Sequence, residues 1–328
     1  MKNILIVIFF SICSSSFSQR LIEVGYQVDQ AGNYNFYCNN NAYCNYILEM
    51  GFTTLDNLKC DVALPYRGII KPGKNKLFKL SKENPSAAFQ FKYSMNYAKG
   101  CINPKADTGF TYLLPLSPGK ETQAYVMEKS QQTKSTESSA GGNAQQINPG
   151  SKNWYLIRTR MKPGDTIFAA RRGMVTEVDD RSESNDAGAS SIGNENYVEI
   201  VHADCSFGEY GILRKGSALV KPGQFVEAGT PVGLVGGDKF GRGSEIRFSV
   251  HYNVEPDEAG MNNGKISWEY VSLKFWTKDN GKISLHHGGN YISEFPVAIL
   301  RQELKKPETK KPETKKPSAK PKPKAKSK

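Results

Sequence analysis

The sequence predicts a mainly β protein, with an N-terminal β-sandwich followed by a compact, twisted sheet of the barrel-sandwich hybrid type. Three observations predict this fold class. Short runs of alternating apolar and polar residues recur along most of the 328 residues. Aromatic residues make up 11% of the chain, which favours strands. Glycines recur at even intervals in the second half, as they do where short strands turn sharply.

Residues 1–18 have the three parts of a secretory signal peptide. Lys2 supplies the positive start, residues 4–12 form an apolar stretch too short to span a bilayer, and Ser16 to Ser18 read as a small-x-small cleavage site. Cys13 does not fit a lipoprotein signal, because Ile12 precedes it where a small residue is needed. We therefore expect cleavage near Ser18 and a secreted or periplasmic product.

Residues 19–106 are predicted to form the sandwich. Turn signals such as Lys71-Pro72-Gly73-Lys74 separate short alternating runs, among them YNFYC, KLFKL and AAFQFKYSM. Frequent turns between short alternating runs are typical of a small antiparallel sandwich. The tyrosines here either pack in the core or line a ligand site, and the pattern favours packing.

Two segments are predicted to lie outside any core. Residues 129–153, inside the second domain (107–298), have Ile147 as their one large apolar residue and indicate a flexible insertion. Residues 299–328 are predicted to form a disordered Lys/Pro-rich tail in which KKPET occurs twice.

The tail carries most of the charge of the chain. Residues 305–328 hold eleven Lys and two Glu, so most of the net charge of +12 is in the tail and does not indicate specific nucleic-acid binding. The tail is either simply solvated or an electrostatic tether to anionic envelope polymers or a membrane surface.

Cysteine usage also fits an oxidising compartment. Two disulfides among Cys38, Cys44, Cys60 and Cys101 are expected, and Cys38–Cys44 with Cys60–Cys101 is one of three pairings. No C-x-x-C pair or nearby His indicates zinc among them. Cys205 is expected to be a small buried residue.

The informative stretch lies between residues 154 and 250. Val220, Val226 and Val232 recur every six residues, with Gly223 and Gly229 between them. Strands this short must turn often, and glycine supplies the positive φ that such turns require. A compact sheet folded on itself follows from this spacing.

The order of the pieces in this stretch resembles the lysostaphin/LytM-type zinc metallopeptidases, which cut peptide cross-bridges in bacterial cell walls. The chain reads YLIRTRMKPGDT, AARRGMV, NYVEIVHAD, YGIL, VKPGQFVEAGTPVG and EIRFSV. The family's runs are Y-A-I-D-F-x-M-P-x-G-T, A-A-R-x-G-V-V, N-x-V-x-I-x-H-x-D-G, Y-x-H-L, V-x-x-G-x-x-V-x-x-G-x-x-I-G and H-L-H-F-x-V. The match covers about 100 residues, and it implies the family's fold, the duplicated hybrid motif.

The same resemblance implies a degenerate site. The family's zinc-ligand Asp aligns with Arg158 and a zinc-ligand His with Arg247, while two catalytic His align with Ile212 and Glu245; no His precedes His202. Because Arg has no lone pair for a metal, no zinc is expected at these positions. We expect Arg158 and Arg247 to converge near Glu245, where guanidinium–carboxylate pairs hold the shape of the pocket.

The histidines of the chain have simpler interpretations than metal binding. His202 is expected to hydrogen-bond a neighbouring turn, and His251 to be a strand-end residue. His286 and His287 are adjacent, so on a strand they would point to opposite sides.

These features predict an exported metallopeptidase-family homologue that is catalytically inactive and binds peptidoglycan or regulates a cell-wall hydrolase. The candidate groove residues are Arg158, Tyr210, Glu245 and Arg247. An active zinc metalloendopeptidase that cleaves peptidoglycan peptides with a non-standard ligand set is the alternative. A biotinyl or lipoyl carrier domain shares the hybrid fold, but the hairpin candidates at 171–173 and 227–229 lack the Lys that would be modified.

Overall fold

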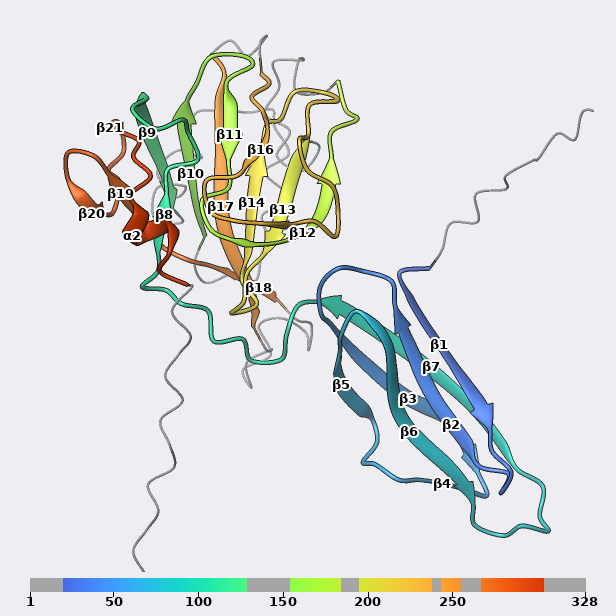
Figure 1. Ribbon diagram of the computed structural model, residues 1–328. Helices are drawn as coiled ribbons and strands as arrows, with labels where there is room; N and C mark the ends of the chain where they lie inside the picture. Colours follow the sequence, from blue (N-terminus) through green and yellow to red (C-terminus); the bar gives the residue numbers. More distant parts are fainter. Residues whose placement is uncertain (1–19, 129–153, 184–194, 238–242, 255–266, 304–328) are drawn as a thin grey trace, which may run out of the picture.

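The computed structural model describes residues 20–128, 154–183, 195–237, 243–254 and 267–303 (Figure 1). The predicted signal peptide, the insertion at 129–153 and the tail beyond 303 lie outside the described residues. As predicted, the chain is mainly β, and its N-terminal part (blue and teal in Figure 1) is followed by a larger β domain. No helix in the described ranges is long and apolar enough to cross a membrane.

Two antiparallel sheets form the N-terminal domain. One has the order β1 (Ile22–Val28), β2 (Tyr34–Asn40), β6 (Gly73–Lys82), β4 (Leu58–Cys60), and the other β5 (Tyr66–Ile70), β3 (Tyr46–Asp56), β7 (Gln90–Lys99). Aromatic rings fill the space between them; the Phe36 and Phe78 rings, for example, stack with their centroids 4.8 Å apart. The domain is thus a sandwich, as its alternating runs predict.

A nine-stranded sheet dominates the C-terminal domain. Its order is β15 (Phe225–Val226), β12 (Gly173–Asp179), β13 (Tyr197–Val201), β14 (Phe207–Gly211), β17 (Glu245–Val254), β10 (Tyr155–Arg160), β9 (Glu121–Glu128), β21 (Asn290–Ile292), and β18 (Ser267–Tyr270) also pairs with β17. The described strands do not close into a barrel.

Two small sheets and one helix complete the described part of this domain. β11 (Thr166–Phe168) pairs with β16 (Pro231–Leu234), and β20 (Gly281–Ile283), β19 (Lys274–Thr277) and β8 (Thr111–Leu113) form a three-stranded sheet. The helix is α2 (Val297–Leu300).

The evenly spaced valines and glycines behave as predicted. Val220, Val226 and Val232 are all buried in the core of the C-terminal domain. Gly223 and Gly229 have φ of +84° and +83°, a conformation that residues with a Cβ rarely adopt.

The large sheet has one core face and one polar face. Ile157, Ile200, Tyr210 and Phe248 point into the core. Because side chains alternate along a strand, Arg158, Glu199, Glu209 and their neighbours lie on the opposite side, which we call the polar face.

Tyr210 was predicted to be a groove residue, and that prediction is wrong. Its side chain is fully buried, and its hydroxyl accepts a hydrogen bond from the Ala170 amide at 2.7 Å. The reason is strand alternation: Tyr210 pairs with Phe248 on the core face, whereas Gly211 pairs with Arg247 on the polar face.

The prediction of two disulfides among Cys38, Cys44, Cys60 and Cys101 is also wrong. Cys101 forms a disulfide with Cys205, and Cys38, Cys44 and Cys60 are free. Cys101 follows the last strand of the sandwich, and the fold places it against the turn before β14, so its partner lies in the other domain. Cys38 and Cys44 serve instead as buried core residues of the sandwich.

The junction between the domains is packed as well as cross-linked. The Phe207 side chain, on the polar face of β14, is fully buried in the core of the sandwich. The Cys101 amide donates to Asn253 Oδ1 at 3.2 Å. One end of the polar face is therefore covered by the N-terminal domain.

The domain also continues past the boundary predicted at residue 298. That position lies inside α2, and Gln302 Nε2 donates to the Thr111 carbonyl at 2.6 Å. Glu303 pairs with the buried guanidinium of Arg171 at 2.6 Å. The contacts of the described domain therefore extend to Glu303.

Candidate functional site

The candidate site lies on the polar face where β10 and β17 run side by side. Their register places Arg158 opposite Arg247 and Arg160 opposite Glu245. Residues two apart on a strand share a face, so all four side chains lie on the polar face. The structure thus brings together three of the four predicted groove residues and adds Arg160.

A buried carboxylate lies among these three guanidiniums. Glu245 is within 3.5 Å of Arg158 Nη1, Arg160 Nη1 and Arg247 Nε. Its side chain is 0% exposed, whereas the side chains of Arg158 and Arg160 are 17% and 31% exposed. The carboxylate is therefore at the bottom and two of the guanidiniums remain open to solvent above it.

Two further residues hold the guanidiniums in place. The Tyr125 ring, on β9, lies 5.5 Å from the Arg158 guanidinium carbon and 5.0 Å from that of Arg160, distances typical of cation–π contacts. Glu195 forms an ion pair with Arg247. We call Arg158, Arg160 and Arg247, together with Glu245, Glu195 and Tyr125, the arginine cluster.

Charge in the arginine cluster is positive on balance, with three guanidiniums against two carboxylates. Burial and the neighbouring Arg158 lower the pKa of Arg247 to about 10, so that it still carries its charge at neutral pH. Arg158 Nε and Arg247 Nε are buried and have no hydrogen-bond acceptor among the residues that the structure describes. The cluster therefore has buried donor capacity that an anionic oxygen would satisfy.

Ile212 directly follows Gly211, the register partner of Arg247. Its φ is +69°, an unusual conformation for a β-branched residue that typically costs about 1–3 kcal/mol. Gly211 allows close packing here, because a Cβ at this position would lie 3.1 Å from Glu195 Oε2. The chain beside the cluster is thus tightly constrained.

A second charged group lies on the polar face, over β12, β13 and β14. Glu177, Glu199 and Glu209 form a row across these strands, which we call the carboxylate row. Lys99, from the end of β7, reaches it from the N-terminal domain, and its Nζ lies 2.8 Å from both Glu177 Oε2 and Glu199 Oε1. Burial would lower the pKa of Lys99, but the Glu199 and Glu177 carboxylates outweigh it and raise the pKa above its usual range.

The arginine cluster does not fit the zinc ion that its position would imply. Arg158 and Arg247 carry permanent positive charge and no lone pair, so they repel a cation. The carboxylates that could bind a metal, Glu245 and Glu195, are both ion-paired with arginines. Elsewhere in the described ranges, no group of three or more His, Cys, Asp or Glu is placed to hold an ion.

The histidines have structural surroundings. His202 Nδ1 lies 2.9 Å from the Arg172 carbonyl, in the turn before β12, and burial lowers the pKa of His202 to about 3. His251 was predicted at a strand end, but it lies within β17, with its ring stacked on Phe207 at 5.8 Å. His287 Nδ1 lies 2.9 Å from the Val126 carbonyl. His202 and His251 are buried, and buried histidines with such partners are typical of packing, whereas His287 is exposed.

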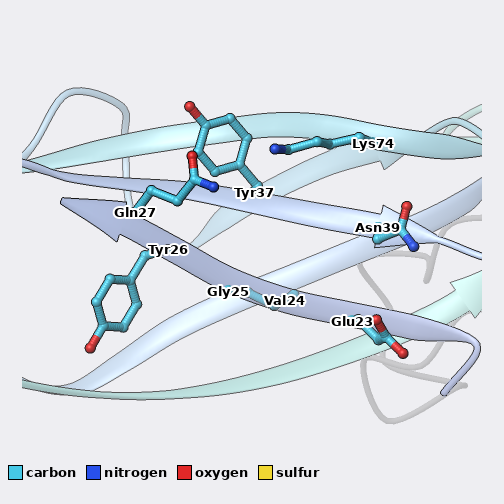
Figure 2. A pocket seen from close by; sticks show the side chains of 8 residues that line it. All are labelled: Glu23, Val24, Gly25, Tyr26, Gln27, Tyr37, Asn39 and Lys74. Carbon is cyan, nitrogen blue, oxygen red and sulfur yellow. The ribbon is translucent and has the colours of Figure 1, made fainter. Parts of the chain in front are cut away.

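The sandwich carries a shallow pocket of about 340 Å³ over β1, β2 and β6 (Figure 2). Lys74 Nζ lies 4.5 Å from the centre of the Tyr37 ring, and Figure 2 shows Tyr26 turned away from these two residues. Tyr26 instead packs edge-on against Tyr34 and Phe91. Tyr26 thus combines ring packing with 47% exposure, and Tyr37 lines the pocket beside Lys74.

Residues 152–259 match the family model of Peptidase family M23. This segment holds β10 and β17 and every residue of the arginine cluster except Tyr125. Over these residues the C-terminal domain is therefore similar to the M23 peptidases, the family of the lysostaphin/LytM type. No curated protein matches the chain.

Solved structures of M23 proteins are similar to parts of the chain. The catalytic domain of the prophage-encoded protein EnpA from Enterococcus faecalis is 27% identical over 34% of this chain and 72% of its own, with a TM-score of 0.23. Pseudoalterin, an M23 metalloprotease from the deep sea, is 14% identical. The match covers 57% of this chain and 96% of pseudoalterin, with a TM-score of 0.28. Lysostaphin is 21% identical over 30% of this chain, with a TM-score of 0.24, and the match spans 36% of lysostaphin's own length. At these TM-scores the structural likeness carries no argument, so the similarity to Peptidase family M23 rests on the family model over residues 152–259.

Arg160, Tyr125 and Glu195 were missed from the sequence. Arg160 has a usable signal, because it lies two positions after Arg158 on the same predicted strand. Tyr125 and Glu195 belong to none of the motifs, and only the pairing of β9 with β10 and the ion pair with Arg247 reveal them.

Proposed function

We propose that this chain is an exported M23 homologue without peptidase activity, which binds peptide segments of peptidoglycan on the polar face of its C-terminal sheet. One observation carries the proposal: Arg158 and Arg247 face each other on adjacent strands, at the positions where the resemblance calls for zinc ligands. A site that has replaced its metal by guanidiniums loses the activation of water but keeps positive charge for peptide oxygens.

The chemistry of the described site supports binding over hydrolysis. A guanidinium cannot act as a general base near neutral pH, since it does not give up its proton there. His251, the histidine of the polar face, is packed between Phe207 and Trp268 in the domain junction and does not contact the arginine cluster. The guanidiniums of Arg158, Arg160 and Arg247 thus supply positive charge for a bound peptide and no general base.

A protein of this kind can act in the cell wall in two ways. It can hold wall peptides directly, or it can regulate a wall hydrolase by occupying the same peptides or by contacting the enzyme. The Lys-rich tail predicted at residues 299–328, with its lysines at 305–328, would add electrostatic attraction to anionic envelope polymers in either case.

Two measurements on the purified mature chain test the proposal. We expect it to sediment with insoluble peptidoglycan, to release no peptide fragments with or without added zinc, and to hold far less than one equivalent of zinc by elemental analysis. Zinc at one equivalent together with zinc-dependent cleavage would instead establish the active peptidase. A chain that neither binds nor cleaves peptidoglycan would overturn the proposal.

A further inference from the structure

We infer that the arginine cluster is a carboxylate-binding site, and that it recognises the free carboxylate at the end or on a side chain of a peptide. The inference rests on the proposed function and names the chemical group that the polar face takes.

Exposure within the cluster decides which charge a ligand meets. Glu245 is fully buried, while the side chains of Arg158 and Arg160 remain partly exposed. An approaching ligand therefore meets the guanidiniums of Arg158 and Arg160, and Glu195 beside Arg247, but not the buried carboxylate of Glu245. A group with negative oxygens is attracted, whereas an ammonium is repelled.

Two of the guanidiniums, those of Arg158 and Arg247, keep donor groups beyond their ion pairs. Glu245 lies 3.5 Å from each of its three arginine partners, longer than the 2.7–2.9 Å typical of a charge-assisted hydrogen bond. Arg158 and Arg247 each keep a buried Nε–H without an acceptor in the described part of the chain. Arg158, the more exposed of these two, can thus turn donors toward an incoming carboxylate without losing a tight contact.

Rigid support makes the site suitable for binding. Arg158 and Arg160 project from a central strand of the sheet, and both lie beside the ring of Tyr125. Guanidiniums that are held before a ligand arrives lose less conformational freedom on binding. Arginine also presents parallel N–H donors that match the two oxygens of a carboxylate.

The charge balance favours a monoanion. Three guanidiniums against Glu245 and Glu195 leave about one positive charge, which one carboxylate neutralises. A phosphate dianion would exceed this balance. Because peptidoglycan stem peptides carry free carboxylates, the inferred group is present on the proposed ligand.

Titration calorimetry with two matched peptides tests the inference on the full mature chain. The probes are diacetyl-Lys-D-Ala-D-Ala with a free C-terminal carboxylate and the same peptide as its C-terminal amide. We expect the amide to bind at least tenfold more weakly, and inorganic phosphate to compete weakly or not at all. Equal binding of acid and amide, or tighter binding of phosphate than of the acid, would overturn the inference.

Two variants connect the binding to the cluster. The double variant Arg158→Gln/Arg160→Gln is expected to weaken binding of the acid about tenfold or more and to leave binding of the amide nearly unchanged. Arg158→Lys keeps the charge but not the paired donors, so we expect an intermediate loss. Lys74→Gln, an exposed cation of the sandwich, is the matched control and should bind as the parent does. Thermal melting of each variant checks that it is folded.

The outcomes separate this inference from the proposed function. If the double variant still sediments with peptidoglycan and binds the acid as the parent does, the carboxylate site is wrong while peptidoglycan binding stands. If the parent binds neither peptidoglycan nor either peptide, the proposed function fails, and the carboxylate inference fails with it.

Discussion

The arginine cluster and the carboxylate row lie on the same polar face, yet their charges are satisfied in different ways. In the carboxylate row, Lys99 of the N-terminal domain reaches Glu177 and Glu199 at 2.8 Å each. In the arginine cluster, the buried Glu245 lies 3.5 Å from each guanidinium, and two arginine side chains stay open to solvent. In the first group a lysine of the other domain lies close to two of the carboxylates, whereas in the second the guanidiniums of Arg158 and Arg160 keep partial exposure to solvent.

The difference separates a structural role from a binding role. A charged group that finds a close partner within the chain stabilises the contact between domains. A group of like charges that stays partly exposed raises the local potential and attracts a ligand of opposite sign. We therefore expect changes to the carboxylate row to alter stability alone, and changes to the arginine cluster to alter ligand binding as well.

Glu245→Gln tests the cluster most severely. It leaves three guanidiniums facing each other without the carboxylate beneath them, and removal of one partner from a buried ion pair typically costs about 3–5 kcal/mol. We expect a loss of about 3 kcal/mol in the free energy of unfolding, measured by urea denaturation. We also expect tighter binding of a carboxylate peptide in calorimetry, because the cluster gains net positive charge.

The exposed Glu121, at the start of β9, provides the matched control for that change. Glu121→Gln should alter the free energy of unfolding by less than about 0.5 kcal/mol. A Glu245→Gln variant that loses stability and also loses peptide binding would show that Glu245 helps to hold the ligand, and the comparison would need revision.

Lys99→Met tests the carboxylate row, with a smaller expected effect. The methionine keeps most of the length of the side chain but leaves Glu177 and Glu199 without their cation. Because Glu177 is half exposed, we expect a loss of about 2–3 kcal/mol in the free energy of unfolding, below the full cost of a buried charge. Binding of the carboxylate peptide should be unchanged.

Lys92 lies on the same strand and is exposed, so Lys92→Met is the control and should have little effect on stability. If Lys99→Met weakens peptide binding tenfold while the protein remains folded, the two charged groups act as one surface and the comparison fails.

The sequence could predict the arginine cluster better than the carboxylate row and its lysine. The spacing of Val220, Val226 and Val232 predicts the sheet, and strand alternation from Arg158 would also have found Arg160. The same rule excludes Tyr210, since it is adjacent to Gly211 and so points to the other face. Within one strand, the alternation of side chains alone thus predicts which residues share a face of the sheet.

Contacts between the domains could not be predicted in this way. Lys99 meets Glu199 and Cys101 meets Cys205 across about a hundred residues of chain, and nothing in their local sequence indicates the partner. The packing of Phe207 into the sandwich decides these pairings. Long-range pairs depend on how two folded surfaces meet, which a local pattern does not contain.

Glu209→Gln gives the smallest and the most pH-dependent effect. Glu209 lies in the carboxylate row between Glu199 of β13 and Ser249 of β17, with Lys99 and Glu177 beyond and Tyr270 of β18 nearby. Burial, followed by repulsion from Glu199, raises the pKa of Glu209 from 4.5 to about 7, although Lys99 opposes the shift.

The sign of the effect follows from this raised pKa. The protonated carboxyl stabilises the fold fully below pH 4.5, and that contribution is lost as the pH rises through about 7. Glutamine resembles the protonated form and does not titrate. We therefore expect parent and Glu209→Gln to have similar free energies of unfolding at pH 4, and the variant to be more stable by about 1–3 kcal/mol at pH 8.

Denaturation curves at intervals between pH 4 and pH 8 measure this difference, with Glu121→Gln as the control that should follow the parent throughout. A Glu209→Gln variant that is less stable than the parent at pH 8 would mean that the ionised Glu209 makes a favourable contact. The carboxylate row would then hold enough positive charge to balance Glu209 as well as Glu177 and Glu199, and the raised pKa of Glu209 would be wrong.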